Sequence, residues 1–355
     1  MHIRHLELTH FRNHISHRVA LHPKSNLIVG PNAVGKTTLL EAIYLGSTGR
    51  SFRTHHLNEM IHWKAERFRL VMAFEKCDIG QFVSVNYGKN AQENSVYYNR
   101  TRLSGMRALH STVPCITMHP KDVMIIRGGP SERRQFLDEL IGQLDPLYHH
   151  HLNRYQGTLK QRNAVLKSGK KSMIATYDTI LASSGSYIVL KREETIRSLD
   201  AIVLDKYQHL GGRLEPLQLI YQPSVAFDLQ TTAEGVIENA LLEAFQRNLE
   251  RDLKLGQSTV GPHRDEMNIL IEMQDASEYA SEGQTRSCAA ALKMAEWDYL
   301  RQHTSIDPIM LIDDFGMGLD LHRRQRLLKE LPQLGQVIIT STVHEEGFGE
   351  IHCLE

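Results

Sequence analysis

The chain has 355 residues, with 41 Lys and Arg against 41 Asp and Glu. This length is too great for one small core and predicts two domains or lobes. The balanced charge argues against a general polyanion-binding protein, so any contact with nucleic acid must use a local patch. None of the four cysteines forms a Cys-x-x-Cys pair, which argues against a zinc site or a disulfide framework. No secretory h-region and no apolar stretch of membrane length occurs, so we expect a cytoplasmic protein with no membrane partner.

The most informative stretch lies near the N-terminus, between an apolar run and a helical pattern. Residues 26–29 are apolar enough for a buried strand, and apolar residues recur at helical spacing over residues 39–44. The connecting residues are Gly30, Pro31, Asn32, Ala33, Val34, Gly35, Lys36, Thr37 and Thr38. They match the P-loop pattern of two glycines at fixed spacing followed by Lys and Thr. The pattern predicts ATP and Mg²⁺ as cofactors, with Lys36 at the β- and γ-phosphates and Thr37 at the metal.

Alternating apolar and polar residues predict strands in much of the first 120 residues. Residues 67–99 have the pattern of an antiparallel set, and residues 115–118 form a further apolar stretch. Arg50 and Arg53 follow the P-loop closely. They can contact phosphate or face solvent, and the sequence leaves both interpretations open.

The pattern changes near residue 121, where long helical periodicities begin. No acidic residue occurs from residue 146 to residue 177. This window contains the basic residues Arg154, Lys160, Arg162, Lys167, Lys170 and Lys171. An acid-free basic segment in a chain of zero net charge predicts a face that binds DNA phosphates. A solvated helix face is the alternative.

Two further motifs lie in the last hundred residues. The apolar strand predicted at residues 309–312 ends in Asp313 and Asp314, which is the Walker B arrangement when it lies beside a P-loop. We expect Asp313 to hold Mg²⁺ and Asp314 to be the catalytic residue that orients or deprotonates water. Upstream, a second phosphate-facing edge is predicted before a helix at residues 286–300. Its residues are Ser281, Gly283 and Gln284.

Several other stretches carry a family resemblance. They are residues 11–13, 49–53, 133–138, 261–265 and 291–296. With the P-loop, the Ser-x-Gly-Gln edge and the Asp pair, they resemble the ATP-binding-cassette (ABC) superfamily and, more closely, the RecF family of bacterial DNA repair proteins. The resemblance extends over nearly the whole chain. The segments at 133–138 and 261–265 are specific to that family, whereas many NTPases share the P-loop.

The resemblance implies an α/β fold with an ABC-type P-loop ATPase head of mixed β-sheets and helices. The head would comprise residues 1–120 and 257–355, with a mainly helical lobe inserted at residues 121–256. It also implies an ATP-dependent homodimer in which Ser281, Gly283 and Gln284 contact the ATP of the other subunit. Such a dimer would bind single-stranded, gapped or double-stranded DNA near the nucleoid and hydrolyse ATP slowly. The implied partners are RecR, RecO and RecA, and the implied roles are RecA loading, replication-fork recovery and the SOS response.

Two residues differ from those that are common at the same positions of related ATPases. Ala33 stands where a glycine of the loop is common. Asp314 is one methylene shorter than the Glu that is usual in fast transport ATPases, which predicts slow turnover.

Two other functions share these motifs. One is the ATPase subunit of a transporter, in which the signature follows the P-loop without an intervening helical lobe. The other is a DNA clamp that binds ATP without hydrolysing it.

Overall fold

The computed structural model describes residues 1–90, 92, 94–110, 112–169, 171–211, 215–227, 233–315, 320–343 and 350–354. By their internal contacts these residues form two compact units. The first unit comprises Met1–Val123, Lys206–Arg213 and Glu282–Glu355, and the second comprises Met124–Asp205 and Leu214–Ser281. Residues 257–281, which were predicted to belong to the head, therefore group with the second unit. The division into a head and an inserted lobe stays a prediction.

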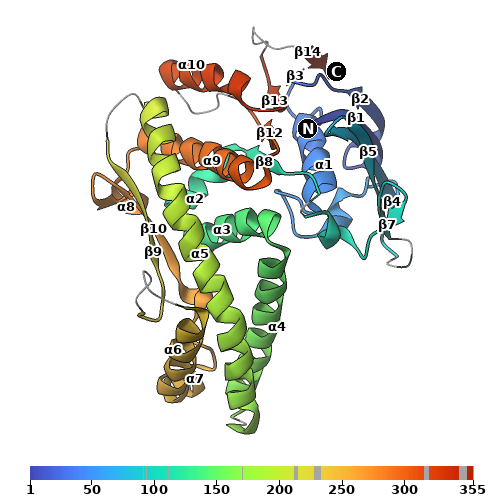
Figure 1. The fold of residues 1–355 in the computed structure, drawn as a ribbon. Coiled ribbons are helices and arrows are strands. Elements are labelled where there is room, and N and C mark those ends of the chain that lie inside the picture. The colour runs from blue at the N-terminus through green and yellow to red at the C-terminus, as the bar shows by residue number, and fades with distance from the viewer. Residues whose placement is uncertain are drawn as a thin grey trace. The chain divides into compact units, whose positions relative to one another are not determined.

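The first unit contains two β-sheets (Figure 1). The antiparallel sheet has the order β2-β1-β4-β5-β6-β7. Its strands are β1 (His2–Phe11), β2 (His14–Ala20), β4 (Arg67–Lys76), β5 (Ile79–Gly88), β6 (Ser95–Tyr98) and β7 (Thr101–Arg102). The parallel sheet has the order β14-β3-β13-β12-β8. Its strands are β3 (Ser25–Val29), β8 (Cys115–Met118), β12 (Ile309–Ile312), β13 (Val337–Ser341) and β14 (Glu350–Cys353). The antiparallel set predicted at residues 67–99 is confirmed, and the apolar stretch at residues 115–118 forms β8.

Helix α1 (Lys36–Thr48) packs between these two sheets. Every residue of α1 except Thr37 is buried. Its apolar side chains belong to one core cluster with Leu8 and Met72 of the antiparallel sheet and Leu311 and Ile338 of the parallel sheet. A helix that is covered on both sides needs apolar residues around its whole circumference. This packing fixes the start of α1, and with it the P-loop, against the edge of the parallel sheet.

The first unit contains further helices besides α1. They are α9 (Glu282–Thr304) and α10 (Leu321–Glu330), with short 3-10 helices at Leu57–Met60, Met106–Leu109, Pro120–Asp122 and Leu331–Gln333. Helix α9 packs against β8. The indole Nε1–H of Trp297 on α9 donates to the carbonyl oxygen of Pro308 (2.8 Å), just before β12.

The second unit is mainly helical, as predicted for the inserted lobe. Its helices are α2 (Val123–Arg127), α3 (Pro130–Leu144), α4 (Pro146–Ser168), α5 (Ile174–Gly211), α6 (Glu234–Arg247), α7 (Leu249–Leu255) and α8 (Ala276–Tyr279), with 3-10 turns at Lys171–Met173 and Pro262–Arg264. The end of α5 belongs to the first unit. A small antiparallel sheet has the order β11-β10-β9, formed by β9 (Leu217–Gln222), β10 (Glu266–Ile271) and β11 (Gln274–Asp275). No helix in the described part of the chain has the length and apolar character that a membrane crossing requires.

Candidate functional site

The strand order of the parallel sheet brings three distant segments to one edge. Strand β13 lies between β3 and β12, and all three run parallel, with Ile28 opposite Thr340 and Ile312 opposite Ile339. The carboxyl ends of parallel strands meet at the same edge of a sheet, which is where open α/β sheets bind ligands. Here β3 leads into the P-loop, β12 leads into the Asp pair, and β13 ends beside both.

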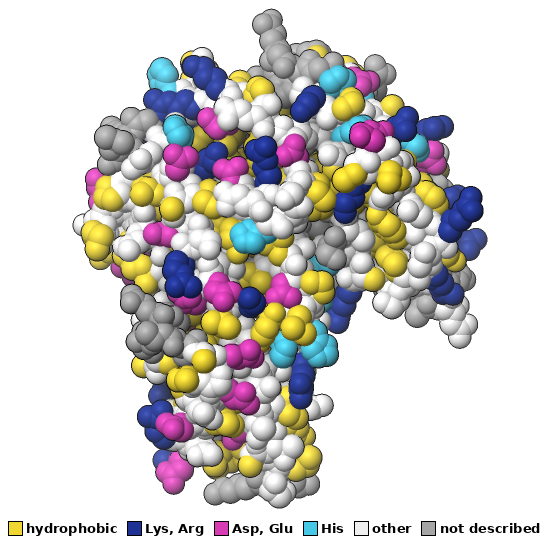
Figure 2. Space-filling view, viewed as in Figure 1, with side chains coloured by type: hydrophobic (Ala, Val, Ile, Leu, Met, Phe, Trp, Pro, Cys, Tyr) yellow, Lys and Arg dark blue, Asp and Glu magenta, His cyan; other side chains and the backbone are white. Residues whose placement is uncertain are grey.

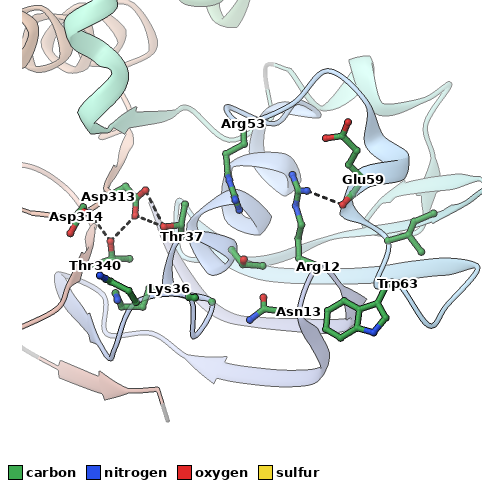
Figure 3. A pocket seen from close by; sticks show the side chains of 15 residues that line it. Arg12, Asn13, Lys36, Thr37, Arg53, Glu59, Trp63, Asp313, Asp314 and Thr340 are labelled. Atoms are coloured by element: carbon green, nitrogen blue, oxygen red, sulfur yellow. Dashed lines mark hydrogen bonds between the residues drawn. The ribbon is translucent and has the colours of Figure 1, made fainter.

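Hydrogen bonds join these three strand ends at one carboxylate (Figure 3). The hydroxyl of Thr37 donates to Oδ1 of Asp313 (2.9 Å) and lies 3.1 Å from Oδ2. The hydroxyl of Thr340 donates to the same Oδ1 (2.8 Å) and accepts the backbone N–H of Asp314 (2.8 Å). Asp313 and Thr37 therefore converge although the sequence separates them by 276 positions.

The P-loop curls around the side chain of Lys36. The ammonium of Lys36 donates to the carbonyl oxygens of Gly30 (2.7 Å) and Pro31 (2.8 Å). Gly35 has φ 114°, and a Cβ on it would lie 2.6 Å from Nε2 of His14, so only glycine fits. Ala33 has φ 67°, a left-handed conformation in which glycine has no steric penalty. This conformation explains why glycine is common at that position of the loop.

A cavity of about 540 Å³ opens over this loop, which is within the usual range for a small-molecule site. Six residues of the predicted P-loop line it: Asn32, Ala33, Gly35, Lys36, Thr37 and Thr38. Asp313, Asp314 and Thr340 line the same cavity. Of the remaining P-loop residues, Gly30 and Pro31 contribute the carbonyls that hold Lys36, and the carbonyl of Val34 accepts the side-chain amide of Asn13 (2.9 Å).

Arg12 and Arg53 also line the cavity, and both are positioned by a buried carboxylate on α1. Arg12 makes a two-pronged ion pair with the fully buried Glu41, at 2.9 and 2.6 Å. Arg53 adds a third contact to Glu41 (3.1 Å), and Ser51 donates its hydroxyl at 2.5 Å. From the sequence, Arg53 could either contact phosphate or face solvent, and in the structure it lines the cavity. A glutamate within an apolar helical pattern requires buried cationic partners. Glu41 was therefore the sequence feature that could have indicated the positions of Arg12 and Arg53.

The donor set of the site fits Mg²⁺. The Thr37 hydroxyl and the Asp313 carboxylate are oxygen ligands, which magnesium prefers, and their hydrogen bond shows that they point at a common position. Asp314 adds a second carboxylate at the cavity wall. It has φ 57°, a conformation that Asp adopts more readily than most residues.

Comparisons with known proteins agree with this geometry. The family described as RecF/RecN/SMC N terminal domain matches residues 2–350. The DNA replication and repair protein RecF of Protochlamydia amoebophila (strain UWE25) is 40% identical over 343 residues, covering 96% of this chain and 94% of that protein. The protein of the same name from Chlamydia abortus is 36% identical over 342 residues, covering 96% and 92%. The chain belongs to the RecF family.

Solved structures support the same assignment. A structure described as the recombination mediator protein RecF with ATP in the RecFOR pathway superposes with a TM-score of 0.90 at 30% identity, covering 98% of this chain and 93% of that chain. The Smc head domain of Pyrococcus furiosus superposes with a TM-score of 0.56 at 16% identity, covering 96% and 90%, and indicates the fold alone. The predicted family and the predicted fold class are therefore confirmed. The RecF relatives are named DNA replication and repair proteins.

The residues of the predicted second phosphate-facing edge, Ser281, Gly283 and Gln284, lie at the start of α9. Ser281 is exposed and directly precedes the helix, whereas Gly283 and Gln284 lie in its first turn. A Cβ on Gly283 would lie 2.5 Å from the guanidinium of Arg323, so a side chain at this position would displace that group. The described residues that line the P-loop cavity do not include Gly283 or Gln284. Their contact with ATP across a dimer stays a prediction.

One of the DNA-contact candidates is wrong. The side chain of Arg162 is fully buried, with Asp178 at 2.6 Å and Asp252 at 2.7 Å. Two buried carboxylates hold this guanidinium in the interior, so it is not available to a phosphate. Arg154, Lys160 and Lys167 are exposed on α4. Lys171 begins a 3-10 helix, and Lys170 lies outside the described residues.

Proposed function

We propose that this RecF-family chain is an ATP-dependent DNA-binding switch of recombinational repair, which acts as a recombination mediator in the RecFOR pathway. The observation that carries the proposal is the convergence of Thr37, Asp313 and Thr340 beneath a P-loop lysine. Relatives of the same family are named for DNA replication and repair, and a solved RecF is described with ATP. We therefore propose ATP as the ligand of the cavity.

Each residue of the site has a role in this proposal. Backbone N–H groups of the loop and the start of α1 hold the phosphates, and the Lys36 ammonium turns from the Gly30 and Pro31 carbonyls to the β- and γ-phosphates. Thr37 and Asp313 hold Mg²⁺, which supplies positive charge to the phosphates when bound. Thr340 fixes the Asp313 carboxylate and the Asp314 backbone. Asp314 orients or deprotonates the attacking water, and its short side chain makes hydrolysis slow.

The partners proposed for the chain follow from its family. ATP would join two copies so that Ser281, Gly283 and Gln284 of each contact the nucleotide of the other. The dimer would bind single-stranded, gapped or double-stranded DNA in the cytoplasm, cooperate with RecR and RecO, assist RecA loading and support the SOS response. On the face drawn in Figure 2, Lys and Arg side chains are interspersed with Asp and Glu. This distribution favours local phosphate contacts over a broad basic field.

Replacement of Lys36 by Ala tests the nucleotide site. The variant should lose measurable ATP hydrolysis and bind ATP at least tenfold more weakly, because no ammonium then neutralises the phosphates. Calorimetric titration with ATP and Mg²⁺ measures the affinity. Lys24→Ala, which removes an exposed lysine of the same unit, is the control and should bind ATP as the wild type does. Equal affinities in Lys36→Ala and wild type would contradict the proposal.

The two other functions considered above are separated by simple observations. Family membership argues against a transporter subunit, and co-purification with a membrane protein would be needed to restore that interpretation. A clamp that never hydrolyses ATP would retain bound ATP indefinitely in a single-turnover experiment. Slow release of ADP and phosphate supports the switch instead.

A further inference from the structure

We propose that Trp63 is the platform on which the nucleobase of the bound nucleotide stacks. This inference deepens the proposed function and depends on ATP binding at the P-loop. It assigns a base-recognition role to a residue outside every motif considered above.

The position of Trp63 in the cavity is the first observation. One end of the cavity is polar and is lined by Lys36, Thr37 and Asp313. Trp63 and Ile61 also line the cavity. Figure 3 shows Trp63 at the end opposite to the Asp pair, with Arg12 and Asn13 between them. Phosphates belong at the charged end, so the base of the same ligand lies toward the aromatic end. A cavity with one charged and one aromatic end fits a nucleoside triphosphate.

The exposure of Trp63 is the second observation. Its side chain is 72% exposed, whereas Trp297, the other tryptophan of the chain, is 1% exposed. Tryptophan is well buried on average, and an exposed indole at a cavity wall leaves a large apolar face in water. A stacked base would cover that face.

The backing of the indole is the third observation. The ring of His62 stacks on Trp63 with centroids 4.0 Å apart and an angle of 26° between planes. His62 is itself buried, and its Nδ1 accepts the backbone N–H of Lys64 (3.1 Å). One face of the indole is therefore supported by the His62 ring, and the 72% exposure of Trp63 leaves room for a ligand on the other face.

The backbone beneath this pair is also held in place. The N–H of His62 donates to the carbonyl of His10 (2.8 Å), and the N–H of Arg12 donates to the carbonyl of Met60 (2.7 Å). The next residue on that strand turn, Asn13, donates its side-chain amide to the P-loop carbonyl of Val34. The platform and the phosphate loop are thus tied to the same end of β1. A preorganised platform loses little conformational entropy when the base binds.

Two variants and two ligands test the inference. Trp63→Ala should weaken ATP binding by about tenfold, which equals about 1.4 kcal/mol and lies within the range for base–aromatic stacking. Trp63→Phe should retain most of the affinity, because it keeps an aromatic face. Inorganic tripolyphosphate has no base, so wild type and both variants should bind it equally.

Tryptophan fluorescence gives a second readout. Iodide should quench Trp63 in the free protein, and ATP should shield it, whereas tripolyphosphate should leave it accessible. The buried Trp297 serves as the internal reference, and in Trp63→Phe the remaining emission should not respond to ATP. Equal iodide quenching with and without bound ATP would overturn the inference.

The outcomes separate this inference from the proposed function. If wild type and Trp63→Ala bind ATP with the same affinity, the stacking role is wrong while the P-loop proposal survives. If Trp63→Ala loses DNA binding at unchanged ATP affinity, the indole serves nucleic acid and the inference is also wrong. If wild type binds neither ATP nor tripolyphosphate, the proposed nucleotide site itself fails.

Discussion

Asp122 illustrates how burial alone changes the chemistry of a single residue. Its carboxyl group is buried after β8, and this burial raises its pKa from 3.8 to about 6. The positive charge of Lys293 and the N–H of His119 act in the opposite direction. The folded protein therefore binds a proton at Asp122 at a higher pH than the unfolded chain does. The resulting stabilisation is complete below about pH 3.8 and is lost as the pH rises through about 6.

This shift predicts a difference in pH dependence between wild type and Asp122→Asn. The interval between the two pKa values is equivalent to roughly 3 kcal/mol. Asparagine cannot titrate, yet it keeps an oxygen that accepts the His119 N–H. The free energy of unfolding of wild type minus that of the variant should therefore fall by up to this amount between pH 4 and pH 7. Urea unfolding at several pH values measures it, and a constant difference would contradict the raised pKa.

At the scale of a secondary-structure element, α4 separates buried from exposed basic residues. Arg162 is fully buried and also lies 5.2 Å from the ring centroid of Phe245. Lys160 and Lys167, seven positions apart, share an exposed face of the helix, because successive residues rotate by about 100°. Arg154 points about 120° away from Lys160. The exposed face that could bind phosphate is therefore smaller than the six Lys and Arg residues of the basic window suggest.

Removing the buried guanidinium should destabilise the second unit. Arg162→Met would leave Asp178 and Asp252 as buried carboxylates without their cation, which costs about 3–5 kcal/mol. Lys160→Met, an exposed position on the same helix, is the matched control and should change the free energy of unfolding by less than about 0.5 kcal/mol. Denaturant unfolding compares them. Equal stability of the two variants would show that the buried network contributes little.

The exposed face of α4 gives a separate prediction for DNA. If Lys160 and Lys167 both contact phosphate, the double change to Ala should reduce the log–log salt slope of duplex binding by about 1.8, or 0.9 for each contact. Fluorescence anisotropy over a range of salt concentrations measures this slope. An unchanged slope would identify this face as merely solvated and direct attention to other basic residues.

The proposed function requires ATP to join two copies of the chain. Ser281 is exposed before α9, where a hydroxyl and helix N–H groups can donate hydrogen bonds to a phosphate held by another subunit. A nucleotide that binds the dimer better than the monomer drives association by linkage. Such a contact would create two identical sites around a two-fold axis.

Ser281→Arg should block that association. The bulky side chain would obstruct the proposed contact between two copies, while Lys36 and Thr37 should still bind ATP within one copy. Sedimentation with ATP and Mg²⁺ should show dimers for wild type and monomers for the variant, and ATP should no longer strengthen its DNA binding. Ser281→Ala, which adds no bulk, should still dimerise. A variant with Arg that dimerises like wild type would remove Ser281 from the composite site.

Local residue patterns were enough to predict the contiguous parts of the candidate nucleotide site. The P-loop is one contiguous run, and its conformation depends on glycines and a helix start that lie within nine residues. The strand that delivers Asp313 and Asp314 is also recognisable from its own residues. For the same reason the family could be identified from short motifs, and the strands at residues 67–99 could be predicted from their alternation.

Strand order and long-range packing bring together the distant residues that complete the candidate site. Thr340 reaches Asp313 because β13 lies between β3 and β12. A local sequence pattern cannot predict the order of strands in a sheet. Trp63 lines the cavity because its segment pairs with the end of β1. Arg162 looked like a surface cation because helical periodicity does not reveal which carboxylates pack against a side chain, and Asp252 comes from a segment 90 positions away. Long-range packing assigns a charged residue to the interior or to the surface, and composition alone cannot.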